Sequence, residues 1–368
     1  MQTKLHQPIA IYAAQGISAG QNSSASGVLQ REQTPPQLTQ CDDNIFGTYK
    51  AAAIQPSLNA QIQEWAKSSK ARQRADRVGQ LAGYVTSKIL SDSDLRLQMF
   101  SKLSLLVGSS RGATTSLESA LRTFLETGKV PTHTSPTTTL GALTSCIAQE
   151  SLQPATLFGL SATCTSGLTA LIQGIALLDS DQAEACIAVG TEAPITPFTH
   201  AILRAAGVLA SAWDTPFPCT PLAHEHAPGS GMILGEGAAA FLLARLHESK
   251  IPAPPLAVIS GFATAMEKTP SPTGISEDAT GLQDTMKQAV EMSGGIVPDL
   301  IIAHAPGTRK GDASELRAIE AVFGLAESRP AIYSPKWFLG HTLGASGSLS
   351  LLLGIELLTR EILPLLPY

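Results

Sequence analysis

The sequence predicts an α/β fold in which helices pack against a parallel sheet. Short apolar runs at 103–107 and 186–189 have the length and residue content of buried strands. Between them, Leu168, Leu171 and Ile175 recur at helical spacing. A strand, a helix and a second strand in this order form a parallel pair with the helix against the sheet. The same pattern restarts after a proline-rich stretch.

The composition is that of a globular protein, with 368 residues of which 43% are hydrophobic and 15% charged. The formal net charge is −5, so the chain lacks the basic field of a nucleic-acid-binding protein, and we expect no nucleic-acid partner. No segment is long and apolar enough for a signal peptide or a membrane span, so we expect no membrane insertion. The cysteines lack the spacing of a zinc site or a disulfide framework. We therefore expect a reducing, cytoplasmic location.

The first part of the chain begins with an apolar strand at 8–12, followed by a long Gly-, Ser- and Gln-rich stretch without clear periodicity. Residues 57–97 carry apolar side chains at helical intervals. The strand at 103–107 leads through a turn at 108–112 into a helix at 116–127. A phosphate cradle is the alternative interpretation of this turn. Its glycine spacing matches neither the Walker nor the dinucleotide motif, which favours a simple turn.

The stretch 155–168 is a strand that turns sharply into a helix at a cysteine. Cys164 lies among small residues, and the helical spacing begins at Leu168. A sulfur at a helix N-terminus faces unpaired N–H groups and the positive end of the helix dipole, which favour the nucleophilic thiolate. Small neighbours let a substrate carbonyl approach, as in other nucleophile elbows. A buried cysteine that packs as a small hydrophobic side chain is the alternative, and this stretch alone leaves both open.

The strand at 186–189 is followed by a partly helical region and then by a Pro- and His-rich loop at 213–228. This loop contains His224 and His226, but no third ligand has a recognisable spacing, so we expect a solvated loop and no metal. Glycines at the start of the next strand, 238–243, indicate close approach of another backbone.

The Pro-rich stretch 251–255 is the expected linker between an N-terminal half, 1–250, and a C-terminal half, 251–368. The second half is expected to contain strands at 256–262, 300–303 and 331–333 and helices at 281–293, 315–323 and 348–358. His304 follows a strand of this half, and His341 lies in a Gly-rich loop that opens a helix. Ligands of α/β sheets gather at such carboxyl ends of strands.

One cysteine and two histidines at strand-to-helix turns suit acyl transfer to sulfur followed by reaction with a carbanion. Cys164 would hold the acyl group as a thioester, which divides one difficult reaction into two. Imidazoles kept neutral by burial and helix N-termini, at His304 and His341, would donate hydrogen bonds to the enolate oxygen formed when a malonyl thioester loses CO2. A Cys-His-Asn hydrolase uses one histidine and needs no second. The pair therefore favours condensation over hydrolysis.

At these residues the chain resembles the β-ketoacyl-(acyl-carrier-protein) synthases, the elongating condensing enzymes of the thiolase fold. The similar segments are 162–167, 190–192, 234–238, 303–315 and 336–347. The resemblance implies a thiolase-like fold, with two pseudo-duplicated βαβ halves in a layered α-β-α-β-α core. It also implies that no cofactor is bound and that the substrates are carried on the 4'-phosphopantetheine of an acyl carrier protein.

The resemblance also implies roles for individual residues. Cys164 is the expected nucleophile, and His304 and His341 are the pair that promotes decarboxylation. The supporting residues are expected to be Lys336, Glu315 and Asp312, and the substrate-binding residues Thr308 and Gly307.

The chain departs from the family pattern at three places. Thr163 stands where an alanine usually precedes the cysteine, and Pro306 replaces the first threonine of the usual His-Gly-Thr-x-Thr segment, of which Thr308 remains. The sequence also stops at 364–368, before the final hairpin and the Gly-Phe-Gly-Gly-Thr-Asn loop of the family, and thus resembles a short form. That loop supplies an acyl gate and one of two backbone donors to the thioester oxygen.

Two functions are compatible with the sequence. The first is an active synthase subunit of type II fatty-acid or polyketide biosynthesis, polyene pigments included. The second is a chain-length-factor-like partner that shapes the acyl tunnel of an active ketosynthase. Chain-length factors lack the cysteine, so Cys164 favours the first. The resemblance implies either a homodimer or a heterodimer with a longer ketosynthase homologue, with the strand at 186–189 pairing across the two-fold axis.

Overall fold

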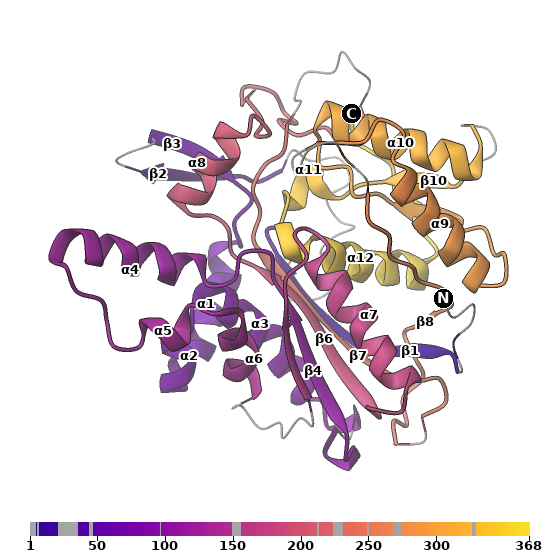
Figure 1. Ribbon diagram of the computed structural model, residues 1–368, viewed down its shortest axis with the longest axis horizontal. Coiled ribbons are helices and arrows are strands. Elements are labelled where there is room, and N and C mark those ends of the chain that lie inside the picture. The colour runs from indigo at the N-terminus through magenta and orange to yellow at the C-terminus, as the bar shows by residue number, and fades with distance from the viewer. Residues whose placement is uncertain are drawn as a thin grey trace.

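The computed structural model describes residues 5, 7–20, 36–43, 47–95, 97–148, 156–211, 213–223, 231–248, 250–267, 269, 274–325 and 329–368. Figure 1 shows a large sheet with helices on both faces and a smaller second sheet beyond them. Among the helices of this described part, none is long and apolar enough to cross a membrane.

The large sheet has six strands in the order β5-β4-β6-β7-β1-β8. Their bounds are β1 (Ile9–Ser18), β4 (Leu103–Gly108), β5 (Thr156–Leu160), β6 (Ala185–Glu192), β7 (Gly237–Arg245) and β8 (Ala257–Ile259). β4 pairs in parallel with β5 and β6, as predicted, whereas β7 is antiparallel to both β6 and β1. The sheet is therefore mixed. The sequence did not reveal the direction of β7, because strands buried on both faces are continuous apolar runs whichever way they point.

The prediction that the strand at 186–189 pairs with a partner chain is wrong. β6, which contains residues 186–189, lies between β4 and β7 and is hydrogen-bonded along both edges. It has no edge left for a partner chain. The free edges belong instead to β8 and to β5, where Leu157 is 42% exposed. Because β5 leads directly into the cysteine turn, this edge lies beside the candidate site.

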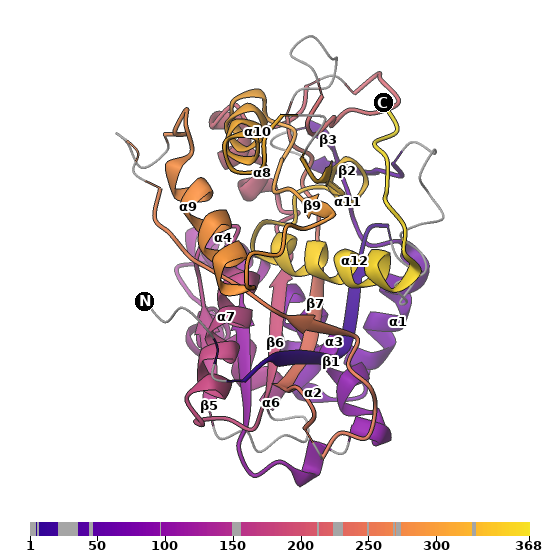
Figure 2. The ribbon, with the colours of Figure 1, turned by 90° about the vertical axis from the view of Figure 1, so that its right-hand side faces the viewer.

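Helices cover both faces of the large sheet. On one face lie α1 (Pro56–Lys67), α2 (Lys70–Arg74), α3 (Arg77–Leu90) and α6 (Leu140–Ala148). On the other face lie α7 (Ser166–Asp179) and α12 (Ser346–Arg360), and Figure 2 shows α12 running across the strands. Successive side chains of β4 point to opposite faces of the sheet and pack in different cores. Leu105 and Val107 pack toward α3, and Leu106 packs toward α7.

Beyond α12 is a second sheet of two short parallel strands, β9 (Leu300–Ile302) and β10 (Ala331–Tyr333). Its companions are α9 (Thr280–Met292) and α10 (Arg309–Phe323), which pack on each other. This arrangement confirms the predicted α-β-α-β-α layers. The first strand after the proposed linker, β8, joins the large sheet instead, and the division of the chain at 250 stays a prediction.

The remaining elements are peripheral or short. They are β2 (Thr39–Asp43), β3 (Gly47–Ala51), α4 (Thr114–Thr127), α5 (Thr134–Thr137), α8 (Pro197–Ala205), α11 (Lys336–Leu339) and the 3-10 turns at Ser93–Leu95, Leu97–Met99 and Leu343–Ala345. β2 and β3 form an antiparallel pair that the sequence did not predict, since the predicted loop ended at residue 40.

Candidate active site

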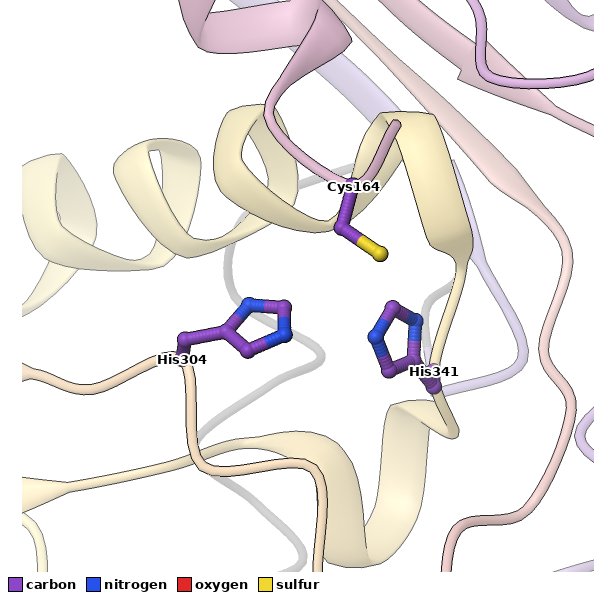
Figure 3. Close-up of side chains that lie close together, drawn as sticks. All are labelled: Cys164, His304 and His341. Carbon is purple, nitrogen blue, oxygen red and sulfur yellow. The ribbon is translucent and has the colours of Figure 1, made fainter. Parts of the chain in front are cut away.

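Three predicted residues from distant parts of the chain meet in one place. Cys164 lies between β5 and α7, His304 follows β9, and His341 lies between α11 and α12. Figure 3 shows the sulfur pointing toward the two imidazole rings. One ligand-type atom from each side chain lies within 4.8 Å of the others, and the two rings are 5.1 Å apart at an interplanar angle of 78°. A single thioester carbonyl can therefore touch all three groups.

The turn that carries Cys164 is fixed by its own small residues. The Ser166 hydroxyl donates to the Thr163 carbonyl at 2.6 Å and accepts the Ala162 N–H at 2.9 Å. Thr163 has φ +50°, which a β-branched residue rarely adopts. Gly108 of β4 lies against the first turn of α7, where a Cβ would collide with the Ser166 carbonyl. This is the close approach that the small residues permit.

The prediction of a thiolate at Cys164 is wrong in the resting protein. Burial raises the pKa of the thiol above its usual value, and Glu192 acts in the same direction, while Lys336 and the backbone lower it. Desolvation disfavours the charged form more than the nearby positive charges and the backbone hydrogen bond favour it. Cys164 therefore rests as a thiol and must lose its proton during the reaction.

His341 is held as a neutral hydrogen-bond donor. Its ring is buried, and its Nδ1 accepts the Leu343 N–H at 2.9 Å, with the Ser346 hydroxyl at 3.3 Å. A nitrogen that accepts these bonds carries no hydrogen, so the hydrogen is assigned to Nε2. Burial, assisted by the charge of Lys336, lowers the pKa of His341 to about 3. The ring is thus an uncharged N–H donor at neutral pH.

His304 is fixed through its backbone. The carboxylate of Glu315 accepts the N–H groups of His304 at 2.7 Å and of Ala305 at 2.6 Å. The His304 side chain lines the cavity and is exposed there. Desolvation by the protein around the ring, together with the charges of Lys336 and His341, holds its pKa well below the usual range. Both predicted imidazoles are therefore neutral, and Glu315 supports the histidine by shaping its turn.

Lys336 is a buried cation at the first position of α11. Burial lowers its pKa, and Glu315 and then Cys164 oppose that shift. Its charge lowers the pKa of each of the three cluster residues. Lys336 therefore favours uncharged histidines and a more acidic thiol.

Asp312 connects two backbone segments behind the site through hydrogen bonds. One carboxylate oxygen accepts the Gly307 N–H at 3.1 Å and the other accepts the Leu222 N–H at 2.9 Å. Burial raises the pKa of Asp312 to about 6 against the effect of these bonds. Of the two predicted substrate-binding residues, Thr308 lines the cavity, whereas Gly307 lies behind its wall, where a Cβ would meet Cys219.

Glu192 links the two halves of the site, a role that the sequence did not indicate. Its carboxylate is fully buried and accepts the N–H groups of Ser110 at 2.6 Å, Arg111 at 3.2 Å and Gly344 at 2.9 Å, and the Ser109 hydroxyl at 2.9 Å. The glycine-rich turn after β4 is thus an anion cradle, but its anion is the protein's own carboxylate. Through the Gly344 bond, Glu192 holds the backbone next to His341 against the turn after β4.

We expect Glu192→Ala to lower the free energy of unfolding by about 3 kcal/mol or more, because several buried donors lose their acceptor. Glu192→Gln keeps one oxygen and should cost less. Urea unfolding monitored by tryptophan fluorescence measures the change, with the exposed Glu291→Ala as control. Equal stability of Glu192→Ala and the control would contradict the role of Glu192.

A cavity of about 950 Å³ opens at the cluster, where Cys164 and His304 line it and His341 is not among the lining residues. Its walls come from the cysteine turn, the His304 turn, the cavity-facing side of α12 and the segment before α9. The apolar side chains among them are Leu168, Ile275, Leu282, Ile302 and Leu351, and the polar ones include Thr163, Thr308, Ser350 and Lys336. Among these walls, the residues from α12 and those from 274–282 were not predicted from the sequence. Helical spacing marks the buried stripe of a helix but not the part of it that faces a cavity.

Cys164, His304 and His341 are also the residues that could offer three ligand atoms to a metal ion. If the site transfers an acyl group, the same sulfur and ring nitrogens face the bound thioester. His224 and His226, for which a solvated loop was predicted, lie outside the described residues.

The layers and the cluster define a thiolase-like α/β protein in which a cysteine at a nucleophile elbow faces two neutral imidazoles. The chain belongs to the β-ketoacyl synthase family. Residues 15–249 match the family's N-terminal domain and residues 256–367 its C-terminal domain.

Individual relatives agree with this assignment. The tetracenomycin polyketide synthase ketoacyl synthase alpha subunit of Streptomyces glaucescens is 29% identical over 293 residues, which span 75% of this chain and 67% of that protein. The solved ishigamide ketosynthase/chain length factor has a TM-score of 0.82 at 18% identity, covering 98% of this chain and 88% of that one. A type II polyketide synthase ketosynthase, solved in complex with its acyl-carrier protein, has a TM-score of 0.77 at 17% identity, covering 98% and 88%. These likenesses confirm the thiolase-like fold.

Proposed function

We propose that this chain is a β-ketoacyl-acyl-carrier-protein synthase subunit of type II polyketide or fatty-acid biosynthesis. It catalyses decarboxylative Claisen condensation of an acyl thioester with a malonyl thioester. The observation that carries the proposal is the convergence of one cysteine and two neutral imidazoles within 4.8 Å, beside a cavity that Cys164 and His304 line. This set offers a nucleophile and two uncharged hydrogen-bond donors, which are the groups that the reaction requires.

In the first half-reaction the Cys164 sulfur attacks the acyl carbonyl. A bond forms from sulfur to the acyl carbon, the bond to the carrier sulfur breaks, and the carrier leaves as a thiol with the proton of Cys164. His304 passes this proton, because the second nitrogen of His341 is occupied by Leu343 and Ser346. The thiol is less acidic than usual, so a base beside it lowers the barrier.

In the second half-reaction a malonyl thioester occupies the same cavity. His304 and His341 donate hydrogen bonds to its carbonyl oxygen, where negative charge develops as CO2 leaves. The resulting enolate carbon attacks the acyl group on Cys164. The carbon–carbon bond forms, the bond to Cys164 sulfur breaks, and the released thiolate takes up a proton from water. Neutral imidazoles suit this step because each donates a hydrogen bond to the enolate oxygen and keeps its proton.

The substrates are proposed to arrive on the 4'-phosphopantetheine arm of an acyl carrier protein. The cavity has a largely apolar lining with a few polar residues, Thr308 among them, which suits such an arm. A related ketosynthase of the same fold was solved with its carrier protein. All five cysteines, Cys41, Cys146, Cys164, Cys186 and Cys219, are free thiols, which supports a reducing, cytoplasmic location.

The second candidate function is that of a chain-length-factor-like partner in a heterodimer. It is favoured by the likeness to a ketosynthase/chain length factor structure and by an exposed apolar surface on α4. Leu117, Leu121, Phe124 and Leu125 share one side of this helix and are 50% to 75% exposed. α4 stands out from the body of the protein, as Figure 1 shows. A solvent-exposed face of this kind indicates a protein partner.

We propose that this α4 face, with the edge of β5, contacts the second subunit, either another copy or a longer ketosynthase homologue. Leu121→Asp places a charge in the middle of the face and should shift the protein from dimer to monomer. Analytical ultracentrifugation measures the shift, and Ile296→Asp, at a residue that is also mostly exposed but distant in sequence, is the matched control. An unchanged dimer in Leu121→Asp would show that α4 is not the interface.

The catalytic proposal is tested with the purified chain, alone and mixed with a co-encoded ketosynthase homologue. Acyl carrier protein loaded with an acyl chain is added, and intact mass measurement reports whether the acyl group moves to this chain. Malonyl carrier protein is then added, and CO2 release is followed. Acylation and condensation by the isolated chain support the synthase. Label that appears only on the homologue within a stable heterodimer would favour the chain-length-factor-like function instead.

A further inference from the structure

The tail at 361–368 folds back over the loop at 217–222. The Tyr368 hydroxyl donates a hydrogen bond to the Pro221 carbonyl at 2.8 Å, and its ring lies 5.6 Å from that of Phe217. Phe217 in turn packs edge-on against Trp337, the neighbour of Lys336, at 5.8 Å. The tail therefore touches the loop at both of its ends.

The loop needs such support because one of its residues is strained. Leu222 has φ +62°, in the left-handed region that leucine rarely adopts. Tyr368 binds the carbonyl just before this residue, and Asp312 accepts its N–H. The strained conformation is thus held from both sides.

The same loop lies directly behind the turn that carries His304. Cys219 is fully buried, its sulfur lies 3.5 Å from the Pro306 carbonyl, and it fills the space beside Gly307. Asp312 joins the two segments, since one of its oxygens binds Leu222 and the other binds Gly307. A continuous series of contacts therefore runs from Tyr368 through the loop to the His304 turn.

We propose that Tyr368 is a positioning residue for His304. It holds the 217–222 loop, and the loop with Asp312 holds the turn at 304–308 in the geometry that aims the imidazole at the substrate. This inference rests on the proposed function for its catalytic readout. The hydroxyl contributes through the Pro221 bond and the ring through its contact with Phe217.

The test compares Tyr368→Phe and Tyr368→Ala with Tyr12→Phe. Tyr12 is a matched control because its hydroxyl also donates to a backbone carbonyl, that of Arg245 at 3.0 Å, in the large sheet. We expect malonyl decarboxylation to fall about fivefold in Tyr368→Phe, the effect of one lost hydrogen bond, and further in Tyr368→Ala. Acylation of Cys164 should fall as well, because His304 is also assigned the transfer of the thiol proton in that step.

Hydrogen exchange followed by mass spectrometry provides a readout besides activity. Amides of 304–308 should exchange faster in both Tyr368 variants and should not change in Tyr12→Phe, and the segment around His341 should be unaffected. Unchanged exchange at 304–308 in Tyr368→Ala would overturn the inference, as would an equal loss of activity in Tyr12→Phe. If the unmodified chain neither acylates nor decarboxylates, the proposed function fails, and the exchange data alone decide the role of Tyr368.

Discussion

Cys164→Ala is expected to abolish transfer of the acyl group to this chain and to lower condensation at least about 1,000-fold, as removal of a covalent nucleophile does in other enzymes. The cavity and both imidazoles remain. The variant should therefore still decarboxylate malonyl carrier protein and release an acetyl thioester without forming a new carbon–carbon bond. Intact mass and CO2 release measured on the same sample separate the two activities.

The matched control is Cys186→Ala, which removes a buried thiol from β6, away from the cavity lining. It should keep acyl transfer, although it creates a small cavity in the core. Acylation of the chain in Cys164→Ala at the unmodified level would contradict the role of Cys164 and would point to another nucleophile.

His341→Ala is expected to lower malonyl decarboxylation about 100- to 1,000-fold, the usual effect of removing one preorganised donor to a developing oxyanion. Acylation of Cys164 should fall less, because the proton of the thiol is assigned to His304. His341→Asn, which can place an N–H near the same position, should recover part of the rate. The ratio of the decarboxylation rate to the acylation rate in each variant is the measurement that checks the assignment.

The pH profile provides a second check on His341. Because its pKa is about 3, the ring stays neutral from pH 8 to pH 5, and decarboxylation should not fall through protonation of this residue in that range. The pKa of a histidine in the unfolded chain is near 6.5. The unfolded state therefore binds more protons below this pH, and the stability contributed by neutral His341 is lost as the pH falls from about 6.5 toward 3. A steep loss of decarboxylation near pH 6.5 would show that the imidazole is protonated in its normal range.

Much of the fold could be predicted because the buried strands are distinct apolar runs. The runs at 103–107, 238–243 and 331–333 each fall within a strand of the structure. β2 could not be predicted, since its residues Thr39–Asp43 are mostly polar and lack a buried pattern. The helical stretch at 57–97 is divided by the caps Ser69 and Asp76, whose side chains accept the N–H groups that begin the next helices. Apolar periodicity alone does not show such breaks.

Within the site, the sequence predicted which residues meet but not their protonation or support. Cys164, His304 and His341 are placed together by turns that the glycines and strand ends indicate. The state of the thiol depends on burial by distant residues such as Lys336, and a linear pattern contains no such information. Glu192 was similarly hidden, because a carboxylate at the end of a strand looks solvent-exposed until the turn after β4 and the His341 loop close around it.

The position of β1 has a consequence for how the protein reaches this structure. Ile9 pairs with Arg245 on one side and with Ile259 on the other, so β1 must wait for strands that are synthesised much later. Such non-local pairing makes folding slow, since a long loop must close before any contact compensates for its lost entropy. Until then the edge of β7 and the apolar faces of the first helices stay exposed. The incomplete chain is thus open to aggregation until these strands pair, and the cavity is completed only when α12 lies across the sheet.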